Sequence, residues 1–145
     1  MNTLIISCAS CGKKNRIPAD KQHLHPQCGH CGAALSVAGH GVPVELGDHD
    51  FHDFVKHAPL PVMVDFFSPT CGPCRTMLPI VDNMAREQSQ KFIIAKVDTS
   101  RHQQIASSFN IRGVPTFIFF KNGSLVDQIA GAVGQNVLEQ KLRSL

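Results

Sequence analysis

Cysteine is the residue type with the most chemistry to offer in this 145-residue chain, and all six cysteines occur in pairs separated by two residues. The pairs are Cys8 and Cys11, Cys28 and Cys31, and Cys71 and Cys74. Two thiols at this spacing can supply half of a metal site or can form a reversible disulfide. The residues around each pair indicate which of these uses applies.

The first two pairs form a C-x2-C-x16-C-x2-C pattern, which has the spacing of a four-cysteine zinc site. Zn²⁺ favours four tetrahedral ligands, and thiolates suit it well. Each pair is followed by a glycine, Gly12 or Gly32, which can adopt the positive φ that closes a tight turn around a metal. We therefore predict one zinc ion with four ligands, namely Cys8, Cys11, Cys28 and Cys31.

Other interpretations of this segment stay open. The four thiols could form two disulfides or remain free, and a histidine could replace one of them as a ligand. The candidate histidines are His23, His25, His30 and His40. Because four sulfurs already complete the shell, we expect a structural zinc and not a catalytic one. The thiolates could also act as a redox switch, which peroxide treatment with zinc counting would test.

The third pair lies in a different setting, because it follows an apolar run and opens a helical pattern in VDFFSPTCGPCRTMLP, residues 64–79. The start of a helix has unpaired N–H groups and partial positive charge, which would stabilise a thiolate at Cys71. Cys74 is near enough to attack a mixed disulfide formed by Cys71. No further CxxC pair remains to complete a second metal site, so we predict a redox role for this pair.

The elements that must position the third pair follow from the hydrophobic pattern of residues 42–145. Strands are expected at 42–46, 61–67, 92–97, 116–120 and 124–130, and helices at 49–57, from 73 onward, at 101–109 and at 134–144. The last two strands are joined by Asn122-Gly123, a strong hairpin signal. The residues expected to face the core from the helices are Phe51, Phe54, Val55, Met77, Ile80, Val81, Met84, Val137, Leu138 and Leu142. This alternation predicts an α/β fold.

The domain division follows from the small, glycine-containing segment 36–43, which indicates a linker. We predict a zinc-ribbon-like segment over residues 1–38 and a second domain over residues 39–145. The first is too short to build a sufficient core alone, so a metal would supply the missing folding energy.

Composition excludes several classes of protein. Apolar residues make up 43% and charged residues 17%, so we expect a packed core. The net charge of +3 is too small to indicate nucleic-acid binding, and no aromatic residue lies within residues 1–50 to stack on bases. We expect neither a signal peptide nor a membrane span, because the N-terminus lacks a basic start and no long apolar run occurs. The expected compartment is the reducing cytoplasm.

Three stretches, VDFFSPTCGPCRTMLP, IRGVPTFIFFKNG and AGAV, resemble thioredoxin, and the likeness covers roughly residues 42–145. The N-terminal CxxC pairs resemble the zinc-bearing thioredoxin 2 type of bacteria. The resemblance implies a thioredoxin fold, with a central mixed sheet flanked by helices and a small zinc-ribbon-like segment in front. It also implies a monomeric protein-disulfide reductase without a bound organic cofactor. Such an enzyme takes protein disulfides as substrates and is recycled by an NADPH-dependent thioredoxin reductase.

The resemblance also implies roles for an acid and a base near the dithiol. Cys71 corresponds to the attacking cysteine and Cys74 to the resolving one. Asp65 corresponds to the family's buried acid, whose pKa burial should raise and which exchanges a proton with Cys74. Lys96 corresponds to the basic partner of that acid.

A substrate-docking surface is implied in the same way. Pro115 corresponds to the family's cis-proline, which would present the Val114 backbone to an extended substrate. Gly131 corresponds to a glycine that permits close approach of the substrate, and Gly72 and Pro73 lie between the two thiols on the same surface.

The chain departs from the family at two positions where tryptophan is usual, which are Phe67 and Thr70 here. Thr70 makes the apolar rim beside Cys71 smaller and more polar. Two functions other than the reductase stay open. One is a zinc-ribbon binding module on a passive thioredoxin-like platform, which would tolerate the loss of Cys71. The other is a dithiol oxidase or isomerase, which would have a more oxidising dithiol.

Overall fold

The computed structural model describes residues 3–8, 10–18, 26–35, 43–88 and 91–145. The expected linker at 36–43 lies outside these residues except for Pro43, and so do three of the histidines considered as metal ligands, His23, His25 and His40. Within the described residues no helix is long and apolar enough to cross a bilayer.

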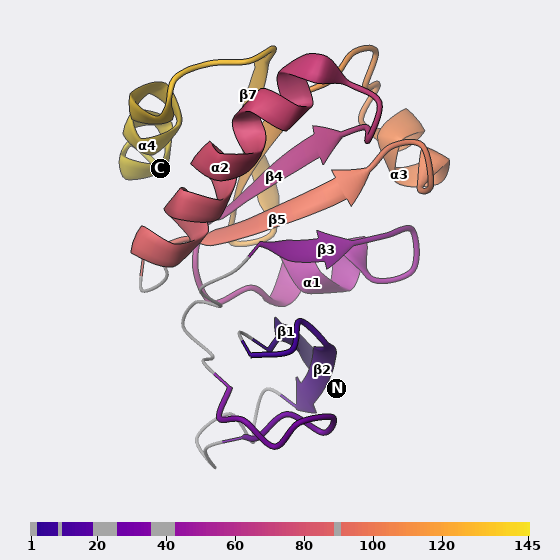
Figure 1. The fold of residues 1–145 in the computed structure, drawn as a ribbon, viewed down its shortest axis with the longest axis vertical. Coiled ribbons are helices and arrows are strands. Elements are labelled where there is room, and N and C mark those ends of the chain that lie inside the picture. The colour runs from indigo at the N-terminus through magenta and orange to yellow at the C-terminus, as the bar shows by residue number, and fades with distance from the viewer. Residues whose placement is uncertain (1–2, 9, 19–25, 36–42, 89–90) are drawn as a thin grey trace.

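The strands form two separate sheets (Figure 1). The strands are β1 (Thr3–Ser7), β2 (Lys14–Pro18), β3 (Val44–Leu46), β4 (Val62–Phe67), β5 (Ile93–Asp98), β6 (Thr116–Lys121) and β7 (Ser124–Ala130). An antiparallel pair, β1 and β2, makes the small sheet, and the large sheet has the order β3-β5-β4-β6-β7. Pairing is parallel from β3 through β5 to β4 and antiparallel from β4 through β6 to β7, so the sheet is mixed.

Helices cover both faces of the large sheet. They are α1 (Phe51–His57), α2 (Gly72–Glu87), α3 (Gln103–Ser108) and α4 (Gln135–Arg143). Side chains of α1 and α3 pack in one core with Val64, Phe66 and Ile118, while side chains of α2 and α4 pack in a second core with Met63, Phe117 and others on the opposite face. In Figure 1, α2 crosses in front of β4 and β5, while α1 lies behind β3.

The two cores have different chemistry. The α1 side is aromatic, because Phe51, Phe66, Phe109 and Phe120 meet with ring centroids between 5.4 and 6.1 Å apart. Such tilted and edge-to-face contacts add to the stability that burial of these rings provides. The α2 side is rich in methionine, whose flexible side chains fill the irregular space beneath the helix that bears the dithiol.

The thioredoxin fold expected from the sequence is confirmed, since each strand and helix expected over residues 42–145 has a counterpart. Asn122 and Gly123 both have positive φ, 53° and 80°, as a tight hairpin turn between right-twisted strands requires. One core prediction is wrong, because Val137 is 46% exposed. Helix α4 buries a narrow stripe formed by Leu138 and Leu142, and Val137 lies to the side of that stripe.

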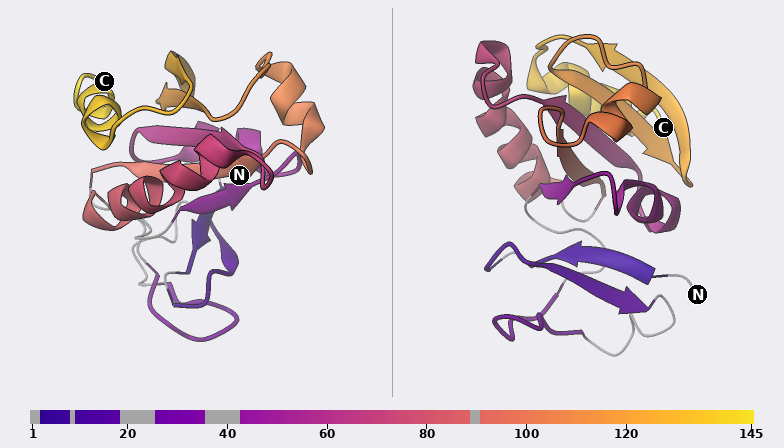
Figure 2. Two further views of the ribbon diagram at one scale, coloured as in Figure 1. Left: turned by 45° about the horizontal axis from the view of Figure 1, so that its top comes forward. Right: turned by 90° about the vertical axis from the view of Figure 1, so that its right-hand side faces the viewer.

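The N-terminal hairpin packs directly against the larger part of the chain. Ile5 of β1 is 4% exposed and belongs to the α1-side core. Lys14 of β2 donates to the Asp50 carboxylate at 2.7 Å, just before α1. Figures 1 and 2 show the hairpin beside α1 and β3 in each view. The pattern of the sequence did not predict β1 and β2, because β2 is short and mostly polar. The division at residues 38 and 39 stays a prediction.

Candidate functional site

The dithiol lies at the junction of β4 and α2. Cys71 is the N-cap residue of α2, and its sulfur accepts the backbone N–H of Cys74 at 3.1 Å. In this structure the two cysteines are joined in a disulfide. Cys74 is 4% exposed, whereas Cys71 is half-buried and Gly72 and Pro73 are exposed. The outer sulfur is therefore the one that a substrate disulfide can reach, and the inner one is shielded.

The turn before the dithiol is held by local hydrogen bonds. The backbone N–H of Cys71 donates to the Ser68 carbonyl at 3.1 Å. The Arg75 guanidinium donates to the Pro69 carbonyl through Nε at 3.2 Å and Nη2 at 3.1 Å. Thr70 is exposed, and its hydroxyl lies 3.1 Å from that of Ser68. Arg75 was not singled out in the sequence, because its role depends on how the turn folds back over the helix.

Val114 and Pro115, two of the residues predicted to bind substrate, form a loop beside Cys71. The Val114–Pro115 peptide bond is cis, and the Val114 carbonyl oxygen is 3.5 Å from the Cys71 sulfur. The Gly131 N–H donates to the Pro115 carbonyl at 2.8 Å, which ties the β7 end to this loop. These residues line a groove of about 300 Å³ that includes Arg112. Substrate docking itself stays a prediction.

Gly131 is required for a reason other than crowding within the chain. Its φ is +93°, in a region that residues with a side chain rarely adopt. A Cβ atom built there would meet no other atom within 4 Å. The backbone conformation therefore explains the glycine, and the open space around it leaves room for a substrate.

Asp65 is buried in the sheet beneath the dithiol. It is 2% exposed on β4, and its Oδ1 atom has no hydrogen-bond partner among the described residues. Burial raises the pKa of Asp65 to about 7, and the nearby Lys96 charge acts in the opposite direction. A carboxyl group with this pKa can both accept and donate a proton near neutral pH.

Lys96 lies directly opposite Asp65 in the parallel pairing of β4 and β5. Its ammonium nitrogen is 4.8 Å from the centre of the Phe67 ring, a cation–π contact. No ion pair joins Lys96 to Asp65 in the part of the chain that the structure describes. Phe67, one of the two departures from the family, thus contacts the lysine.

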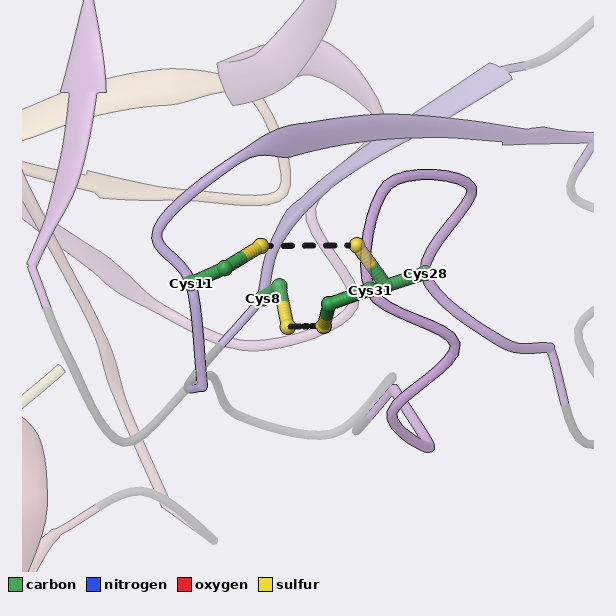
Figure 3. Close-up of side chains that lie close together, drawn as sticks. All are labelled: Cys8, Cys11, Cys28 and Cys31. Carbon is green, nitrogen blue, oxygen red and sulfur yellow. Dashed lines mark hydrogen bonds between the residues drawn. The ribbon is translucent and has the colours of Figure 1, made fainter.

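The four N-terminal cysteines converge from two matching turns (Figure 3). Their sulfurs all lie within 4.8 Å of one another, with Cys8 to Cys31 and Cys11 to Cys28 both at 3.6 Å. A tetrahedron of sulfurs about 2.3 Å from a zinc ion has edges of about 3.8 Å. The donor set and its spacing therefore fit zinc, and all four cysteines are unpaired, not disulfide-bonded.

Glycine closes both turns as predicted. Gly12 has φ of 78° and donates to the Cys8 carbonyl at 2.8 Å. Gly32 has φ of 77° and donates to the Cys28 carbonyl at 2.9 Å. The prediction of positive φ at both glycines is confirmed. His30 is exposed and does not belong to the cluster that could hold a metal.

Backbone N–H groups favour the ionised form of the inner thiols. Those of Cys31 and His30 lower the pKa of Cys28 to about 6. The backbone N–H of Cys11 likewise lowers the pKa of Cys8. Ionised thiols are the form that binds a metal, so the turns prepare these ligands in advance.

Asn15, which was not among the predicted site residues, supports the four-cysteine cluster. Its Nδ2 atom donates to the Lys13 carbonyl at 3.1 Å and lies 3.6 Å from the Cys28 sulfur. Its Oδ1 atom accepts the Gly29 N–H at 2.9 Å. This side chain links the two cysteine turns across the cluster. No sequence signal marks it, because the link joins residues far apart along the chain.

Known proteins resemble the chain over both of its parts. The thioredoxin family model matches residues 42–144, and the model described as "Thioredoxin 2, N-terminal" matches residues 7–33. Thioredoxin C-3 of Corynebacterium nephridii is 37% identical over 139 residues, which cover 96% of this chain and 93% of that protein. Thioredoxin 1 of Nostoc sp. is 41% identical over 98 residues, which cover 68% of this chain and 92% of that protein.

A solved thioredoxin structure is similar to this chain in fold. A single-residue mutant of thioredoxin from Halobacterium salinarum matches with a TM-score of 0.66 and 28% identity, covering 72% of this chain and 90% of that one. The fold and the Cys71–Cys74 pair define a disulfide oxidoreductase. The chain belongs to the thioredoxin family, and its N-terminal segment is the zinc ribbon of the thioredoxin 2 type.

Proposed function

We propose that this chain reduces protein disulfides through the Cys-Gly-Pro-Cys dithiol. The observation that supports this most is the position of the Cys71 sulfur, which accepts an N–H of the first helical turn and lies 3.5 Å from the Val114 carbonyl beside an open groove. A thiolate is stabilised there by the start of α2, and a peptide can approach it along the groove.

The reaction proceeds in two exchanges. The Cys71 thiolate attacks one sulfur of the substrate disulfide and releases the other as a thiolate, which leaves a mixed disulfide. Cys74 then gives its proton to Asp65 and attacks the Cys71 sulfur, which releases the second substrate sulfur as a thiolate. The two substrate thiolates become thiols by taking one proton from Asp65 and one from water. The enzyme is left with the Cys71–Cys74 disulfide seen here. Two electrons from NADPH, passed on by thioredoxin reductase, reduce this disulfide back to the dithiol.

Substrate docking would use the backbone at the cis-proline loop. We assign Val114 and Pro115 to pairing with an extended substrate segment. Gly131, Gly72 and Pro73 form the rest of the contact surface, where small or rigid residues let the substrate backbone come close. Gly72 and Pro73 directly follow the half-buried Cys71, and Val114, Pro115 and Gly131 line the groove.

We further propose that Cys8, Cys11, Cys28 and Cys31 hold one structural zinc ion. When bound, zinc supplies folding energy to a segment with few core residues of its own. The chain's own part is to fix the ligands, through the two glycine-closed turns and Asn15. We place the protein in the cytoplasm, where thiols stay reduced. We expect it to be a monomer there.

An equilibrium titration tests the proposed direction of the reaction. The Cys71–Cys74 couple is titrated against a glutathione buffer, and bound zinc is counted in the same samples. We expect a dithiol more reducing than glutathione and one zinc per chain, since the Gly-Pro pair resembles that of reducing family members. A couple more oxidising than glutathione would contradict the proposal and favour a dithiol oxidase or isomerase.

Replacing Asp65 by asparagine should stabilise the protein and slow the second exchange. The folded-state pKa is raised to about 7 from 3.8, so the folded state binds more protons than the unfolded state between these values. The free energy of unfolding therefore falls as pH rises through this window. We expect Asp65→Asn to gain roughly 2–4 kcal/mol at pH 8 and almost nothing at pH 4.

Urea unfolding of the oxidised protein at both pH values measures this difference. Asp82→Asn is the matched control, because Asp82 is an exposed acid on α2. The same variants should differ in the release of substrate from the mixed disulfide, which we expect to slow about tenfold or more without Asp65. A pH-independent stability difference would show that Asp65 is already ionised throughout.

A further inference from the structure

Three charged residues stand side by side across three strands of the large sheet. Lys96 on β5 is opposite Asp65 on β4 and also opposite Glu45 on β3. Directly opposed residues of neighbouring strands project to the same face of a sheet. Glu45 and Lys96 therefore point to the α2 face, as Asp65 does, with the positive charge between the two acids.

Two cavities show that Lys96 and Glu45 share the same space. A cavity of about 460 Å³ between the N-terminal hairpin and the sheet is lined by Glu45, Lys96 and Asp82, together with Cys11 and Lys14 of the hairpin. A smaller cavity of about 60 Å³ is lined by Glu45 and Lys96 as well, here with Phe67. Lys96 therefore has Glu45 as its neighbour on one side and the buried Asp65 as its neighbour on the other.

We propose that Glu45 is a positioning residue that competes with Asp65 for the Lys96 ammonium, and so keeps Asp65 able to accept and donate a proton near neutral pH. The inference rests on the proposed function, in which Asp65 takes the proton of Cys74. Glu45 touches neither the thiols nor a substrate and acts through the lysine alone.

The contacts of Lys96 support a shared ammonium. The described residues show it over the Phe67 ring at 4.8 Å and in an ion pair with neither acid. The ammonium is therefore not committed to either of the two carboxylates that flank it in the strand pairing. Removing the Glu45 charge leaves more of the attraction for Asp65, which favours the ionised form of Asp65.

Other charged and titratable groups face Lys96 as well. Those that line the two cavities are Asp98, Arg101, His102, Asp82, Lys14, Cys8 and Cys11. Lys14 is engaged by Asp50 at 2.7 Å. On its other side Asp65 is opposite the uncharged Phe117 of β6. Of the acids, Glu45 and Asp65 alone are directly opposed to Lys96 in the strand pairing.

The test is a carbon-13 NMR titration of the Asp65 carboxyl in the full-length, oxidised protein with matched zinc content. We expect Glu45→Gln to lower the titration midpoint of Asp65 by about half to one pH unit. A pKa change of this size is expected when one nearby charge, partly screened by water, is removed. Lys96→Met should raise the midpoint. In the Lys96→Met background, the effect of Glu45→Gln should fall to less than half.

Asp82→Asn is the matched control, because Asp82 lines the same cavity from α2 without being opposed to Lys96 in the sheet. An unchanged midpoint in Glu45→Gln would overturn the proposal. So would an equal shift with and without Lys96, or an equal shift in Asp82→Asn. Because the titration needs no substrate, these outcomes are independent of whether the dithiol reduces protein disulfides.

Discussion

Replacing Cys71 by serine is expected to lower the rate of protein-disulfide reduction by at least about a thousandfold, the scale on which loss of a covalent nucleophile acts. A serine hydroxyl stays protonated at the start of α2 and does not attack a disulfide sulfur. The measurement is the oxidation of NADPH in the presence of thioredoxin reductase and a disulfide-bonded protein. If the thioredoxin part were a passive platform for a binding module, Cys71→Ser would leave the protein's activity unchanged.

Cys74→Ser completes this experiment, because it blocks the second exchange but not the first. The half-buried Cys71 can still attack, and the missing inner thiol leaves the mixed disulfide unresolved. Non-reducing gels and mass spectrometry should show a covalent adduct of the variant with its substrate that reductant removes. An adduct through Cys74 in the Cys71→Ser variant, and none in Cys74→Ser, would reverse the assigned roles.

Loss of one zinc ligand should have the second large effect, this time on the N-terminal segment. Cys28 is 3% exposed and is the thiol to which Asn15 and the His30 N–H come near. We expect Cys28→Ser to weaken zinc binding by more than about a hundredfold, since loss of an outer hydrogen-bond partner alone costs up to about that much. If zinc supplies folding energy to this segment as proposed, amide protons of β1 and β2 should lose their protection from exchange.

The large sheet should keep its protection in the same variant, because its two cores do not depend on the metal. His30→Ala is the matched control, and it should leave zinc affinity unchanged because His30 lies outside the cluster. Full zinc affinity in Cys28→Ser would remove this cysteine from the ligand set. Zinc loss with β1 and β2 still protected would show that docking through Ile5 and Lys14 suffices to fold the hairpin.

The docked N-terminal hairpin borders the space around Lys96 of the large sheet. It forms one wall of the cavity that Lys96 also lines, and the exposed Cys11 lies in that wall. The hairpin therefore contributes to the surroundings of Lys96, which is the strand neighbour of Asp65.

Much of the dithiol site and of the four-cysteine cluster was predictable, because these features depend on single turns of the chain. The dithiol spacing, the glycines that close the two metal turns, and the Asn122-Gly123 hairpin each depend on a few consecutive residues. The inward residues of α1 and α2 follow from helical periodicity in the same way. Val137 shows where this fails, because the width of the buried stripe on α4 depends on what packs against it.

What the sequence by itself determined is local: the three cysteine pairs, their turns, and the order of strands and helices. Only the tertiary structure decided that Asp65, Lys96 and Glu45 lie side by side, because the strand order β3-β5-β4 places neighbours in space that are separate along the chain. It also decided that Asn15 links the cysteine turns and that Phe67 contacts Lys96. Hydrogen bonding within a turn depends on adjacent residues, whereas strand pairing and burial depend on the whole packed core.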